Sequence, residues 1–161
     1  MEEPLVRPFA LTFNPLGIFW GRLSANFELL LAPHHSLVAS PNLLLFGAAD
    51  RPRFMPEGFG FANADSSSFG LEFGYHYWLN WHRSLRGPFL GPSLLLGTPS
   101  DATVGDPTRS QGYWGLAFDV GGQEVFPGGF TIGGGVGLGI ARMAGVWAGF
   151  PRFLFQLGWS F

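Results

Sequence analysis

The stretch Phe153-Leu154-Phe155-Gln156-Leu157-Gly158-Trp159-Ser160-Phe161 decides the fold of this chain. Every second position carries a large apolar side chain, namely Phe153, Phe155, Leu157, Trp159 and Phe161. An alternation with period 2 is typical of a β-strand with two different faces. The run also has the length of ~9–11 residues with which a tilted strand crosses a bilayer. It therefore predicts a membrane-spanning strand.

The composition points in the same direction. Hydrophobic residues make up 47% of the 161 residues and charged residues 12%, against a soluble average of ~25% charged. No apolar run approaches the ~20 residues of a transmembrane helix. The apolar residues must therefore alternate along strands that face lipid, or fill an unusually apolar soluble core. A net charge of −2 and the absence of cysteine exclude electrostatic attraction to nucleic acid, disulfides and cysteine catalysis.

Earlier parts of the chain repeat the alternation, with large apolar residues on one face and small or polar residues on the other. These segments are 23–31, 69–80, 114–120 and 130–140. Three further strand candidates are 9–19, 36–46 and 88–97. Each carries one proline in mid-segment, which is expected to mark a bulge or the end of regular pairing. The sequence therefore predicts an all-β fold with one domain over residues 1–161. The expected architecture is a transmembrane up-and-down antiparallel β-barrel of about eight strands.

The connections between these segments alternate in length. Residues 32–35, 81–87 and 121–128 are short or turn-like, whereas 47–67 and 98–112 are long and polar, and 143–151 are intermediate. Outer-membrane barrels have short periplasmic turns and longer external loops. With periplasmic termini, the three longer connections all fall outside the cell, and the first external loop, near Gly21, is very tight.

The chain resembles the small OmpA-like outer-membrane β-barrels of Gram-negative bacteria. Two stretches carry the resemblance: the final run that ends in Phe161, and Gly87-Pro88-Phe89-Leu90-Gly91-Pro92-Ser93-Leu94. The resemblance implies residence in the cell outer membrane. It also implies that the barrel-insertion machinery recognises the final run as an insertion signal. It implies no activity, because many of these families have none assigned.

Polar residues predicted to point inward or to lie near strand ends are Arg22, Glu28, Glu72, His76, Asp119, Arg142 and Gln156. They could form a polar conduit or an acid–base site. The favoured interpretation is a filled interior, because an eight-stranded barrel is just wide enough for its own side chains. Trp78, also predicted to point inward, would block any lumen.

Two short motifs were weighed as sites. His34-His35-Ser36 faintly resembles the His-x-Ser pair of an outer-membrane lipid A deacylase, and a hydroxyl beside a histidine can transfer acyl groups. The motif falls in an expected periplasmic turn, and its two adjacent histidines would diverge on a strand, so neither catalysis nor metal binding is favoured. The glycine-rich run 133–139 lacks the helix and acidic residue of a dinucleotide site, and more plausibly makes room for interior groups such as Trp78. No cofactor is expected.

Several aromatic residues suit the two interfacial girdles of a membrane barrel. Alternatively, they could form a platform for carbohydrate or aromatic ligands. They are Trp20, Tyr77, Trp81, Trp114, Trp147, Phe150, Trp159 and Phe161. The connection 47–67 holds an unusually apolar and basic set, Arg51, Arg53, Phe54, Met55, Phe59 and Phe61. That set either folds over the barrel mouth or docks a protein partner or lipopolysaccharide phosphate.

The leading hypothesis is a non-enzymatic outer-membrane barrel that acts as a structural or adaptor protein. Its external loops would form the docking surface. The expected partners are membrane lipid and lipopolysaccharide and the insertion machinery, with another protein as a further candidate. Nucleic acid is not expected. The alternatives are a lipid A-modifying enzyme, a narrow channel and, at the level of the fold, a soluble lipid-binding barrel with a polar outside and an apolar inside.

Overall fold

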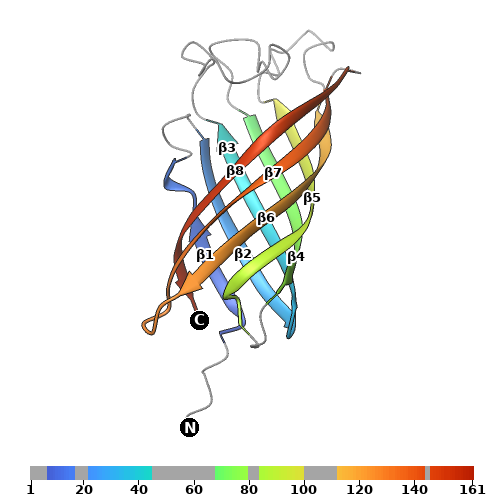
Figure 1. Cartoon of the computed structure of the whole chain (residues 1–161). Coiled ribbons are helices and arrows are strands. Elements are labelled where there is room, and N and C mark those ends of the chain that lie inside the picture. The colour runs from blue at the N-terminus through green and yellow to red at the C-terminus, as the bar shows by residue number, and fades with distance from the viewer. Residues whose placement is uncertain (1–6, 17–21, 45–67, 80–83, 100–111, 144–145) are drawn as a thin grey trace.

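A computed structural model describes residues 7–16, 22–44, 68–79, 84–99, 112–143 and 146–161 (Figure 1). These residues form a closed barrel in which each strand pairs antiparallel with the next one in sequence and β8 pairs with β1. The strands are β1 (Phe9–Phe13), β2 (Arg22–Ala32), β3 (His35–Leu44), β4 (Ser68–Trp78), β5 (Gly87–Pro99), β6 (Tyr113–Val125), β7 (Phe130–Met143) and β8 (Val146–Ser160). The predicted all-β class and eight-stranded antiparallel barrel are confirmed. Among the described residues, no helix is long and apolar enough to cross a membrane.

The two ends of the barrel differ in what they carry. The C-terminus, the start of β1 and the turn between β6 and β7 lie at one end, which we call the terminal end (Figure 1). Phe9 and Phe161 close this end by exchanging two backbone hydrogen bonds, of 3.3 and 2.7 Å. The opposite end, called the distal end, carries the connections 45–67 and 100–111, which fall outside the described residues.

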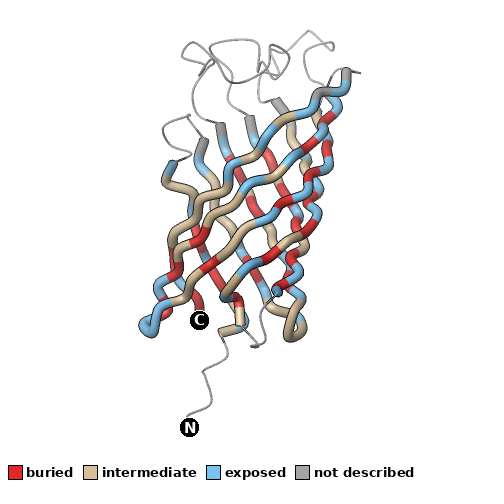
Figure 2. The backbone as a smooth tube through the Cα atoms, in the orientation of Figure 1, coloured by how far each residue is buried: buried red, intermediate tan, exposed pale blue. Residues whose placement is uncertain are grey.

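The barrel wall is apolar outside and polar inside. Outward side chains such as Phe118, Leu138 and Phe153 are 50%, 73% and 74% exposed, whereas inward Asp119 and Glu28 are 1% and 4% exposed. Buried and exposed residues alternate along the strands in Figure 2. This distribution is the reverse of that expected for a soluble lipid-binding barrel.

Prolines interrupt the strand ladders without changing their register. Pro15 follows the end of β1, but Pro41 and Pro92 lie inside β3 and β5. The β2–β3 ladder skips Pro41, and the β4–β5 ladder skips Pro92, yet the same register continues on both sides of each gap. Neither interior proline therefore causes the bulge that was one expectation for it. Each leaves a local gap in one ladder, because proline has no N–H to donate.

Two predicted connections are wrong because the strands run further. β6 continues through residues 121–125, so the turn to β7 lies at 126–129. β8 begins at Val146, so most of the predicted connection 143–151 is strand. β7 pairs with this stretch without interruption, whereas β1 pairs only with residues 157–160 of β8. Pro151 is tolerated because one edge of β8 has no partner strand at that level among the described residues.

Candidate functional site

An apolar cluster fills the barrel interior near the terminal end. Trp78, Phe89, Leu85 and Ala10 are each at most 1% exposed and pack together. The rings of Trp78 and Phe89 lie 5.2 Å apart, and His76 stacks on Phe89 with ring centroids 4.0 Å apart. These side chains leave little room for a lumen, since the interior of an eight-stranded barrel is only about as wide as its side chains.

Next to this cluster, a buried carboxylate is held by hydrogen bonds from neighbouring strands. The Ser36 hydroxyl donates to Glu28 Oε1 at 2.6 Å, and His76 Nδ1 lies 2.9 Å from the same oxygen. Ser36 Oγ in turn accepts a hydrogen bond of 2.8 Å from Trp78 Nε1. A buried carboxylate is tolerated only with such partners. The group therefore ties β2, β3 and β4 together.

Arg152 links three strands across the interior. Its Nη2 donates to Glu72 Oε1 at 2.5 Å, and its Nε lies 3.4 Å from Asp119 Oδ1. Asp119 also accepts a hydrogen bond of 3.1 Å from Ser93. All three charged side chains are at least nine-tenths buried. Since β4 and β8 lie on opposite sides of an eight-stranded ring, the Arg152–Glu72 pair crosses the space that a channel would need.

A row of uncharged polar side chains continues around the interior. Gln156 donates to Gln123 Oε1 at 2.6 Å and accepts from Asn26 at 3.3 Å. Asn26 accepts a hydrogen bond of 2.8 Å from Ser40, and Gln123 donates to the Leu85 carbonyl at 2.7 Å. This row joins β3, β2, β8 and β6 to the backbone at the terminal end.

The glycine-rich part of β7 makes room for these interior groups. A Cβ added to Gly133 would meet the Gln156 side chain, and one added to Gly137 would meet Asp119. A Cβ added to Gly139 would meet the Phe150 ring. The expectation that these glycines accommodate interior side chains holds. The nearest groups come from the neighbouring strands β6 and β8, however, and not from Trp78.

The structure brings together most of the residues predicted for the interior. Glu28, Glu72, His76 and Asp119 are buried, and Gln156 is partly buried in the polar row. The side chain of Arg22, at the start of β2, lies outside the described part of the chain. So do the six predicted docking residues of the connection 47–67, and the aromatic residues Trp20 and Trp81.

Two placements differ from expectation. Arg142 is near the end of β7 but is exposed, because the inward positions of β7 are the odd-numbered ones, such as Gly139 and Ala141. Phe150, predicted for an outer girdle, instead lies on the inward face of β8 beside Gly139. In both cases the alternation along the strand determines which way the side chain points. For Phe150 the alternation applies because β8 begins earlier than predicted.

Sequence analysis missed Arg152. The last strand was expected to begin at Phe153, directly after a connection at 143–151 that contains Gly149 and Pro151. Extending the alternation backwards from Gln156 through Leu154 would have placed Arg152 on the inward face. Ser93 and Gln123 were also missed, although both occupy inward positions of strands.

In the His34-His35-Ser36 motif, the histidines and the serine hydroxyl each bind other residues. His34 Nδ1 lies 2.9 Å from the Trp78 carbonyl oxygen, and His35 Nδ1 lies 2.5 Å from the Tyr75 hydroxyl. Ser36 is fully buried, with its hydroxyl bound to Glu28 and Trp78. Among the described residues, no three His, Asp or Glu side chains gather to hold a metal ion.

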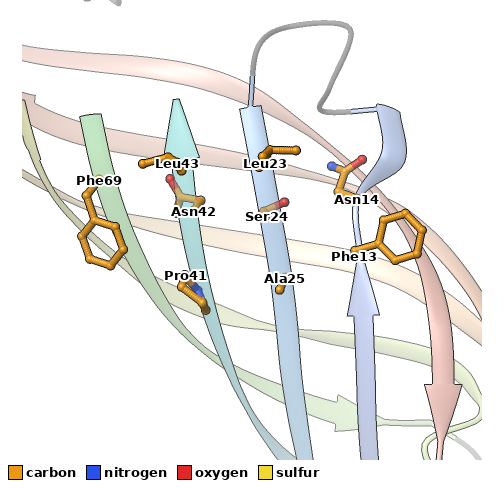
Figure 3. A pocket seen from close by; sticks show the side chains of 9 residues that line it. All are labelled: Phe13, Asn14, Leu23, Ser24, Ala25, Pro41, Asn42, Leu43 and Phe69. Atoms are coloured by element: carbon orange, nitrogen blue, oxygen red, sulfur yellow. The ribbon is translucent and has the colours of Figure 1, made fainter. Parts of the chain in front are cut away.

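The described part of the outer wall contains an open hollow. It measures about 350 Å³ and lies near the distal end beside the gap in the β2–β3 ladder (Figure 3). It forms where small Ala25 is surrounded by larger side chains. Its lining residues are Phe13, Asn14, Leu23, Ser24, Ala25, Pro41, Asn42, Leu43 and Phe69. The lining is mostly apolar, and none of the described lining residues is an acid or a base.

No protein-family model, curated protein or solved structure matches this chain. The function therefore has to be argued from the wall and the interior of the barrel themselves.

Proposed function

We propose that this protein is an OmpA-like barrel of the Gram-negative outer membrane that serves as a non-conducting structural or adaptor protein. The observation that carries the proposal is the reversed polarity of the barrel, with Phe118 half exposed on the wall and Asp119 buried beside it. An exposed apolar wall is costly in water and favourable in lipid. Buried charges that are paired, such as Arg152 with Glu72, suit an interior that is closed rather than conducting.

The orientation follows from the placement of the connections. Short turns lie at the terminal end, where β2 is joined to β3 and β6 to β7, and short turns face the periplasm in outer-membrane barrels. The termini would then be periplasmic and the distal end external. The basic and aromatic residues of the connection 47–67 would lie outside the cell, where they can dock a protein partner or lipopolysaccharide.

We expect the purified protein to run at different apparent masses on a denaturing gel before and after boiling, because a membrane barrel stays folded in detergent until heated.

In planar bilayers the same protein should give no resolvable conductance steps, since Arg152 and Trp78 occupy the interior. A sixteen-stranded porin measured in the same bilayers is the positive control. Steps from this protein would support a channel instead. Recovery in the aqueous phase without detergent would reject the membrane proposal.

Expression in a Gram-negative host should leave the mass spectrum of lipid A unchanged, because the Ser36 hydroxyl is buried and engaged by Glu28 and Trp78. Variants His34→Ala and Ser36→Ala should give the same spectrum as the unaltered protein. Ser93→Ala, which removes another buried hydroxyl, serves as the matched control. Loss of an acyl chain that requires His34 and Ser36, but not Ser93, would revive the enzymatic alternative.

A further inference from the structure

Among the described residues, one cation on the apolar outer wall, Arg142, has no acidic partner. Among the outward-facing residues of the described strands, only Glu124 and Arg142 are charged. Glu124 lies near the terminal end and pairs with Arg86 at 2.5 Å. Arg142 lies near the distal end of β7, is exposed, and has no carboxylate beside it in the described part of the chain. No described carboxylate neutralises its charge, so Arg142 is a candidate for binding an anionic group from outside the protein.

Two tryptophans flank this cation. Arg142 is directly paired with Trp114 of β6 on one side and with Trp147 of β8 on the other. Side chains at such paired positions lie within contact range. The two indole rings meet edge to face, with centroids 5.1 Å apart, and are 43% and 50% exposed. The three side chains form one outward patch, which we call the Arg142 patch.

The height of the Arg142 patch on the wall matches a membrane interface. A second aromatic row lies at the terminal end. There the ring centroid of Phe130 lies 5.8 Å from that of Phe126 and 5.4 Å from that of Trp159. Arg142 is twelve residues beyond Phe130 on β7. At about 3.3 Å per residue and a tilt of about 40°, this separation is about 30 Å along the barrel axis, which is the thickness of the hydrocarbon core.

An arginine at this level is well placed to meet an anion. An arginine on the lipid face destabilises a barrel strongly at the midplane of the bilayer but only slightly near an interface. Phosphate groups of lipids are concentrated at that interface, and the guanidinium binds phosphate through two parallel hydrogen bonds. Exposed indoles beside it offer flat apolar faces to a sugar ring.

We propose that the Arg142 patch binds a phosphorylated sugar of lipid A in the outer leaflet, with Arg142 on the phosphate and Trp114 and Trp147 against the sugar. The inference rests on the proposed function, because it requires the distal end to face outward in the outer membrane. It adds a binding site on the described wall of the barrel, separate from the connection 47–67.

Native mass spectrometry of the full chain in detergent tests the site. The protein is mixed with equal amounts of lipid A, dephosphorylated lipid A and phosphatidylglycerol, and the bound fraction of each is measured. We expect lipid A to dominate, and Arg142→Gln to reduce its binding about tenfold, the effect of losing charge-assisted hydrogen bonds. Arg142→Lys should retain more binding than Arg142→Gln. Arg86→Gln, at the opposite end, should change nothing.

The outcomes separate this site from the proposed function. Unchanged lipid A binding by Arg142→Gln, in protein that still shows the heat-dependent gel shift, overturns the site and leaves the membrane barrel standing. Equal retention of dephosphorylated lipid A overturns the role of phosphate. Equal retention of phosphatidylglycerol overturns the assignment to lipid A. A protein that shows no gel shift and stays in the aqueous phase contradicts the proposed function itself.

Discussion

Replacing Arg152 with alanine should lower the free energy of unfolding of the barrel by about 3–5 kcal/mol, the usual effect of breaking a buried ion pair. The substitution leaves Glu72 and Asp119 buried without their cation. Urea titration in detergent micelles, followed by tryptophan fluorescence and by the unheated gel shift, measures the change. The exposed Arg86–Glu124 pair provides the control, and Arg86→Ala should cost less than about 1 kcal/mol.

A compensated variant separates charge from packing in this experiment. Arg152→Met combined with Glu72→Gln and Asp119→Asn removes all three charges and keeps similar volumes. We expect it to recover most of the stability lost in Arg152→Ala, because neutral replacement of a whole buried ionic group is often close to neutral. If Arg152→Ala loses no more than Arg86→Ala, the interior is hydrated and the proposed closed barrel is wrong.

Introducing arginine at the middle of the outer wall should be the second large effect. Phe118 lies near the middle of β6, and Phe118→Arg should destabilise a bilayer-embedded barrel by about 2–4 kcal/mol. Leu96 lies near the distal end of β5 and pairs with Trp114, which pairs with Arg142, so it lies close to the Arg142 patch. Leu96→Arg should therefore cost at most about 1 kcal/mol.

The comparison is made by urea unfolding of barrels refolded into lipid vesicles. Phe118→Ala accounts for the loss of the aromatic ring without adding charge. A water-exposed wall would tolerate both arginines equally, because a polar residue on a solvated strand face carries no desolvation cost. Equal effects of Phe118→Arg and Leu96→Arg would therefore contradict the membrane proposal, whatever their size.

The fold was accessible from the sequence because one physical rule acts on every strand. An apolar wall and a polar interior impose period 2 along each strand, so the strand number and the inward positions of Glu28, Glu72 and Asp119 follow from the pattern alone. Trp78 follows in the same way. These positions depend only on which face a residue occupies.

The errors occur where a local signal competes with pairing to a neighbouring strand. Pro151 and Gly149 are turn-forming residues, yet β7 holds their segment in the ladder. Local reasoning therefore began β8 too late, at Phe153, and missed Arg152. Which charges meet across the interior depends on strand register, and register is a property of pairs of strands. The Arg152–Glu72 contact, between residues 80 apart in sequence, could not be obtained from either segment by itself.

The shortness of β1 has a consequence for how the barrel assembles. Among the described residues, its ladder with β8 runs from Ala10–Ser160 to Phe13–Leu157 and is extended by the Phe9–Phe161 hydrogen bonds, whereas β7 pairs with β8 along its whole length. This contact joins the most distant parts of the chain and so carries the largest loop-closure entropy. The sheet can therefore grow strand by strand and remain an open ribbon with two free edges until the first and last strands meet. The β1–β8 ladder that closes the barrel is therefore also the ladder with the fewest paired residues among the described strands.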